Sequence, residues 1–88
     1  MLDNSEWQIP SYTYEDLKRY IEDGTPTGDF LYAVLTNNLI EAMVRADSQN
    51  SKKLKEICNF IYHEIPNEAW GTKEKVNNWI KIRRLKKC

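Results

Sequence analysis

The sequence predicts an all-α fold, a compact bundle of about four helices with an ordered N-terminal arm. Its 88 residues are enough for one small domain. With 41% hydrophobic and 30% charged residues, the chain has the composition of a globular domain. Apolar residues recur at helical spacing, and no stretch alternates as a strand does. We therefore expect a single domain over residues 1–88, with the arm over 1–12, a helical core over about 13–80 and a basic C-terminal tail over 81–88.

The arm comes first in the chain, and its large apolar residues Trp7 and Ile9 are expected to lie across the bundle. The first helix is predicted from about Thr13 to Asp23, with Thr13 as its N-cap and Gly24 as its C-terminal stop. Its buried face is predicted to consist of Leu17, Tyr20 and Ile21.

The longest apolar run, GDFLYAVLTNNLIEAMVRAD over residues 28–47, predicts the second helix. One of its sides carries Leu31, Leu35, Leu39, Ala42, Met43 and Ala46, and the opposite side carries Phe30, Ala33, Ile40 and Val44. A helix that is apolar on two sides packs on two sides, so we expect this helix at the centre of the domain. Between the two sides runs a polar stripe of Asn37, Asn38, Glu41 and Arg45.

The polar stripe has two interpretations. Asparagine is a poor residue for a helix interior, because its amide competes for backbone hydrogen bonds. Two in succession, Asn37 and Asn38, therefore suggest a side-chain role. Either all four stripe residues bind a partner, or the amides hydrogen-bond a neighbouring loop while Glu41 and Arg45 form an i, i+4 ion pair. The residues alone leave both open.

Two further helices complete the predicted bundle. The third covers roughly Ser51 to Ile65 and ends before Pro66. Its apolar residues follow the i, i+3, i+4, i+7 rule: Leu54, Ile57, Cys58, Ile61, Tyr62 and Ile65. The fourth begins at Thr72 and presents Val76, Trp79 and Ile80. The aromatic residues of the chain are expected mainly in the core: Trp7, Tyr12, Tyr14, Trp70 and Trp79.

Charge is distributed unevenly, although the formal net charge is zero. Residues 1–50 hold nine acids and three bases, a balance of −6, and residues 51–88 hold four acids and ten bases, a balance of +6. The C-terminal bases are Lys81, Arg83, Arg84, Lys86 and Lys87. They fit phosphate contacts of a nucleic acid, but also a helix C-terminus, whose dipole favours cations without any partner. The opposite charges of the two halves also fit self-association.

Other classes of function find little support in the sequence. His63, the lone histidine, has no nucleophile or carboxylate pair placed beside it, so we predict that the chain is not an enzyme. Cys58 and Cys88 imply neither a disulfide framework nor a metal site, and we expect no cofactor. No apolar run reaches the ~18 residues of a membrane span. The N-terminus has no apolar secretory core, so a cytoplasmic location is expected.

Two stretches carry a resemblance. The pattern GDFLxAVLxNNLxEAxxRADxxN over residues 28–50 and the pattern AWGTxEKVxxW over 69–79 are similar to those of small uncharacterised helical proteins of bacteriophages and mobile elements. The basic tail is longer than this group has. The resemblance implies a source in a bacterial host cell and a helical fold, and it implies no reaction.

Together these observations predict a non-catalytic, phage- or prophage-type protein that acts by protein–protein interaction, for instance by inhibiting or modulating a host protein. A small nucleic-acid-associated protein that uses the basic tail is the first alternative, and a self-associating structural module is the second.

Overall fold

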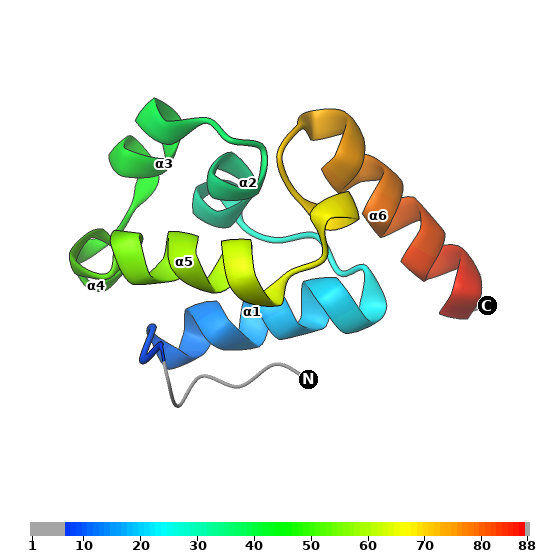
Figure 1. The fold of residues 1–88 in the computed structure, drawn as a ribbon, viewed down its shortest axis with the longest axis horizontal. Helices are drawn as coiled ribbons and strands as arrows, with labels where there is room; N and C mark the ends of the chain where they lie inside the picture. Colours follow the sequence, from blue (N-terminus) through cyan, green and yellow to red (C-terminus); the bar gives the residue numbers. More distant parts are fainter. Residues whose placement is uncertain (1–6, 88) are drawn as a thin grey trace.

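The computed structural model describes residues 7–87, and the regular elements of this part of the chain are all helices, with no strand (Figure 1). The elements are α1 (Ser11–Asp23), α2 (Asp29–Leu35), α3 (Leu39–Arg45), α4 (Ser48–Lys52), α5 (Leu54–Glu64), the 3₁₀ helix η1 (Asn67–Ala69) and α6 (Lys73–Lys87). The radius of gyration, 12.1 Å, is that of a compact domain. Residues 1–6 of the expected arm lie outside the described residues.

Six α-helices occupy the described chain, where the sequence predicts about four, because two of the expected helices are interrupted. The prediction of one continuous helix over residues 28–47 is wrong: α2 ends at Leu35 and α3 begins at Leu39. The third expected helix is divided at Lys53 into α4 and α5. It also begins earlier than predicted, because the Asp47 carboxylate accepts a hydrogen bond of 2.8 Å from the Asn50 N–H and caps α4.

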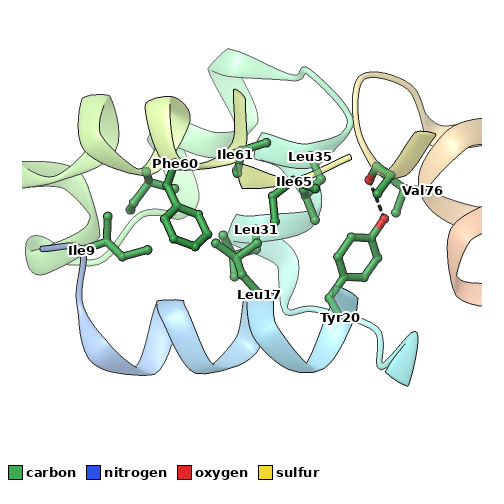
Figure 2. Packing of buried hydrophobic residues seen from close by; sticks show 11 residues of the cluster. Ile9, Leu17, Tyr20, Leu31, Leu35, Phe60, Ile61, Ile65 and Val76 are labelled. Atoms are coloured by element: carbon green, nitrogen blue, oxygen red, sulfur yellow. Dashed lines mark hydrogen bonds between the residues drawn. The ribbon is translucent and has the colours of Figure 1, made fainter. Parts of the chain in front are cut away.

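The core lies between α1, α2 and α5 and is closed at one end by η1 and α6 (Figure 2). Its fully buried large side chains are Leu17, Tyr20, Leu35, Ile57, Phe60 and Val76. Tyr20 is the largest of them, and its hydroxyl donates a hydrogen bond of 2.6 Å to the Ala69 carbonyl. This bond satisfies the buried hydroxyl and ties η1 to α1, because an unpaired hydroxyl in the core would cost about 1–3 kcal/mol.

The N-terminal part of α1 differs from expectation. The helix begins at Ser11, so Thr13 is not its N-cap. Thr13 is buried instead, and its hydroxyl donates a hydrogen bond of 2.6 Å to the Asn50 side-chain oxygen, which links α1 to α4. Tyr12, expected in the core, is exposed and donates to the Asp47 carboxylate over 2.8 Å.

The expected C-terminal tail is helical, since α6 runs as far as Lys87. It packs against the end of α1, where Gly24 has a φ of +71° and closes the helix. A Cβ atom on Gly24 would lie 2.7 Å from the Cβ of Arg83, so the close approach of α6 requires glycine there. The Trp79 indole N–H donates to the Tyr20 carbonyl over 3.1 Å and stabilises the same contact between α6 and α1.

Candidate interaction surface

The surface that the sequence singles out lies at the junction of α2 and α3, and the asparagine pair creates that junction. Asn37 has a φ of +64°, the left-handed conformation that asparagine tolerates better than most residues. Its N–H donates to the Val34 carbonyl over 3.1 Å, and the Asn38 N–H donates to the Ala33 carbonyl over 2.8 Å. This pair of bonds is the Schellman motif, which ends a helix and satisfies its last carbonyls.

The second asparagine starts the next helix. Asn38 is the N-cap of α3, and its side-chain oxygen accepts a hydrogen bond of 3.4 Å from the Glu41 N–H. A further bond comes from far along the chain, because the Gly71 N–H donates to the Leu35 carbonyl over 2.6 Å. In a continuous helix that carbonyl would accept from residue 39. The asparagine pair therefore ends α2 and directly begins α3.

Glu41 and Arg45 form the ion pair that one of the two interpretations of the stripe expects, and Arg45 has a second partner. Its Nε donates to the Glu41 carboxylate over 2.9 Å, and its Nη1 lies 3.3 Å from the Asp29 carboxylate. The hydrogen bond to Glu41, with the charges of both acids, raises the pKa of Arg45. All three groups are exposed, so the cluster contributes little to stability. It nevertheless joins the C-terminal end of α3 to the N-terminal end of α2.

The break brings the four predicted partner-binding residues to two different hollows. Asn38, Glu41 and Arg45 line a hollow of about 200 Å³ beside Lys73. Asn37 does not line it and faces the opposite side, toward α5. The four residues therefore do not form one stripe.

A consequence of the break is an apolar helix face that points outward. Leu39, Ile40, Met43 and Val44 are 63%, 73%, 51% and 75% exposed. These four residues are called the α3 apolar face below. Ala42 is the buried residue of α3. The expectation that both apolar sides of the second helix are buried is therefore wrong over this segment. Because a new helix begins after Asn38, α3 faces the core with Ala42 and not with its larger apolar residues.

The sequence does contain a signal for this arrangement. Asn38 followed by Glu41 three positions later has the spacing of a helix N-terminus, and Asn37 before it is a residue type found at left-handed C-caps. The apolar periodicity across residues 28–47 competes with this local signal and predicts that the α3 apolar face is buried.

Beside the α3 apolar face lies a groove formed by two adjoining hollows of about 310 and 60 Å³. Both are lined by Val34, Asn37 and Cys58. The remaining lining residues are Asn38, Leu39, Ala42, Leu54, Asn59, Ile61, Tyr62 and Trp70. We call the two hollows together the α3–α5 groove. Cys58 and Tyr62, expected on a buried face, are exposed in it, and partial burial raises the pKa of the Cys58 thiol.

Aromatic rings border one end of the groove. Tyr62 meets Trp70 edge to face with ring centroids 6.0 Å apart and meets His63 at 5.1 Å. His63 in turn stacks on Trp7 at 5.5 Å. The buried Trp70 indole N–H has no hydrogen-bond partner among the described residues. The groove therefore combines apolar and aromatic walls with the three side-chain amides of Asn37, Asn38 and Asn59, and no charged group lines it.

The predicted nucleic-acid residues lie on the last turns of α6. Lys81 and Arg84 are exposed, whereas the Arg83 guanidinium lies 4.5 Å from the centre of the Trp79 ring. Such a cation–π contact occupies the charge with an internal partner. The side chains of residues 86–87 lie outside the part of the chain that is described.

The described side chains contain no group of three or more His, Cys, Asp or Glu residues arranged to hold a metal ion. Within residues 7–87, none of the helices combines the length and the apolar character that a bilayer crossing requires. Comparison of the chain with protein-family models, with curated proteins and with solved structures finds no match.

Proposed function

We propose that this chain is a non-catalytic interaction protein of phage or prophage type, which acts in the cytoplasm of a bacterial host by binding a host protein and inhibiting or modulating it. The observation that supports this function is the α3 apolar face. Four large apolar side chains are gathered on two turns of one helix, whereas exposed apolar residues of monomeric proteins are normally scattered singly.

The surroundings of this face also suit an interface. Protein interfaces have an apolar centre and a polar rim, and their centres are depleted of charge. The α3 apolar face and the uncharged α3–α5 groove would form the centre. Asn38, Glu41 and Arg45 would form the rim, with the charge of Arg45 already balanced by two acids. In this arrangement Asn38, Glu41 and Arg45 contribute little to the binding energy. Most of it comes from the α3 apolar face.

The test is affinity capture from the lysate of a bacterial host. The full chain is immobilised next to an Ile40→Glu variant and an Ile82→Glu variant. Ile82 is a matched control, because it is an exposed apolar residue on α6, far from the site in sequence and 50% exposed. We expect one host protein to be retained by the wild type and the control and lost by Ile40→Glu. Equal retention by all three proteins would contradict the proposal.

The nucleic-acid alternative is supported only by the basic residues of α6. Nuclease treatment of the lysate tests this alternative within the affinity capture. Gel retardation of DNA and RNA by the chain at low salt tests it separately. Binding through phosphates weakens steeply as salt rises. No retardation at low salt would reject this alternative.

A further inference from the structure

Helix α3 has few attachments to the rest of the domain. It lies chiefly against α2, and Ala42 is its buried residue. Because stabilisation by burial grows with the apolar area removed from water, an alanine contributes much less to this contact than a buried leucine would. The hydrogen bond from the Glu41 N–H to the Asn38 side chain lies within α3 and its cap, so it does not attach the helix to its neighbours.

The chain is anchored on both sides of α3. Before it, the Leu35 carbonyl at the end of α2 accepts a hydrogen bond of 2.6 Å from the Gly71 N–H. After it, the Asp47 carboxylate at the start of α4 accepts one of 2.8 Å from the Tyr12 hydroxyl of α1. Both anchors lie outside α3, so the helix spans two fixed points.

A non-helical residue separates α3 from each anchor. Asn37 precedes the helix at a φ of +64°, and Ala46 follows it with extended backbone, at a φ of −68° and a ψ of +133°. Residues at the ends of elements are the positions that absorb changes in φ and ψ when a hinge moves. Asn37 and Ala46 are therefore placed as two hinges.

Packing between α3 and α5 is incomplete. A hollow of about 60 Å³ is lined by Leu39 and Ala42 from α3 and by Leu54 and Cys58 from α5. From this hollow, the single buried side chain of α3 and the two flanking hinges, we infer that α3 is a hinged flap that opens while the rest of the domain stays folded. Its motion changes the width of the α3–α5 groove. This motion belongs to the free chain and goes beyond the proposed function, because it needs no partner.

An exposed ion pair holds the flap in the closed position. The Arg45 Nη1 atom, at the C-terminal end of α3, lies 3.3 Å from the Asp29 carboxylate at the start of α2. Glu41 also pairs with Arg45, but it lies on α3 itself and does not attach the flap to α2. Arg45 and Asp29 are both exposed, so salt screens their attraction. The population of the open form therefore rises with ionic strength.

The experiment measures how fast a buried thiol reacts with an uncharged maleimide. Ala42→Cys places the thiol on α3, and Ala69→Cys places it on η1 as a matched control, each in the full chain with Cys58→Ser and Cys88→Ser. The two alanines are 1% and 0% exposed, and Ala69 is tied to α1 by the Tyr20 hydroxyl. Each thiol reacts only when its surroundings open.

The flap predicts different kinetics for the two thiols. Ala42→Cys should react at least about 100-fold faster than Ala69→Cys, because local opening requires less free energy than unfolding of the core. Low concentrations of urea should accelerate the reaction of Ala69→Cys and hardly affect that of Ala42→Cys, because local opening exposes little surface. Equal rates with the same dependence on urea would mean that α3 opens only when the whole domain unfolds, and would overturn the inference.

The ion pair is tested in the Ala42→Cys chain. Asp29→Asn should accelerate labelling about two- to fivefold, the factor that corresponds to an exposed ion pair. Asp16→Asn is the control, because it removes an exposed ion pair with Arg19 on α1, and it should leave the rate unchanged. The effect of Asp29→Asn should disappear near about 1 M salt. Equal effects of the two substitutions would reject the Arg45–Asp29 pair as the closing contact.

Hydrogen exchange of the unmodified chain covers the case in which a cysteine variant does not fold. The amides of Met43 and Val44 on α3 should exchange at least about 100-fold faster, relative to their intrinsic rates, than those of Phe60 and Ile61 on α5. Equal protection of the two helices would contradict the flap. If α3 stays closed and a host protein is still captured through it, the flap is rejected and the proposed function stands.

Discussion

Replacing Asn37 tests the helix break directly, because the two arrangements of this segment predict opposite signs for the same substitutions. In the structure, Asn37 is left-handed and ends α2. Alanine at such a position carries the cost of its Cβ, about 1–2 kcal/mol, and lacks the local hydrogen bonding that moderates this cost for asparagine. Glycine carries no such cost. Asn37→Ala should therefore destabilise the fold by about 1 kcal/mol, and Asn37→Gly should be neutral or stabilising.

A continuous helix reverses both expectations. In a helix interior, alanine is favoured over asparagine by several tenths of a kcal/mol, and glycine is disfavoured. The assay is thermal unfolding followed by far-UV circular dichroism. About 1 kcal/mol corresponds to a Tm change of roughly 4–8 °C in a domain of this size. A Tm above that of the wild type for Asn37→Ala, together with a lower Tm for Asn37→Gly, would refute the break.

Three more outcomes follow from the described contacts. Gly24→Ala should lower the free energy of unfolding by about 1–3 kcal/mol or more, measured by urea titration, because it adds a Cβ at a positive φ and 2.7 Å from the Cβ of Arg83. Trp79→Phe should cost about 1 kcal/mol in the same titration, because the Tyr20 carbonyl loses its indole donor; no change would mean that water replaces it. The pKa of Asp47 is lowered, chiefly by a backbone hydrogen bond, so its ionised form stabilises the fold above the pKa of the unfolded chain, and this contribution is lost as pH falls through the folded value. Asp47→Asn should therefore flatten the loss of stability below about pH 4, and an unchanged acid limb would contradict this.

The helical class and much of the core could be predicted from the sequence, because both depend on local spacing. Leu17 and Tyr20 on α1 and Ile57 and Ile61 on α5 are buried as their periodicity indicates. Apolar spacing of 3.6 residues identifies a buried face whatever the neighbouring helices are.

The break between α2 and α3 could not be predicted in this way, because part of its stabilisation is distant. The Leu35 carbonyl receives its hydrogen bond from Gly71, 36 residues further along the chain. The prediction of Thr13 as an N-cap is wrong for a similar reason, since the hydrogen-bond partner of Thr13, Asn50, is on another helix. Residue type and spacing carry no information about such pairs, so the sequence does not show that Leu39, Ile40, Met43 and Val44 are exposed.

The bond between Gly71 and Leu35 also bears on the order in which the chain folds. During synthesis, residues 28–47 leave the ribosome well before residue 71, so the segment first exists without the donor that accompanies its break. Its apolar periodicity then favours one longer helix, apolar on two sides, although Asn37 and Asn38 favour a break. Contacts of long sequence separation form late, since they require closure of a large loop. The α3 apolar face would accordingly take shape only after η1 and α6 have docked, and until then the nascent chain exposes a broader apolar surface, which is a hazard for aggregation.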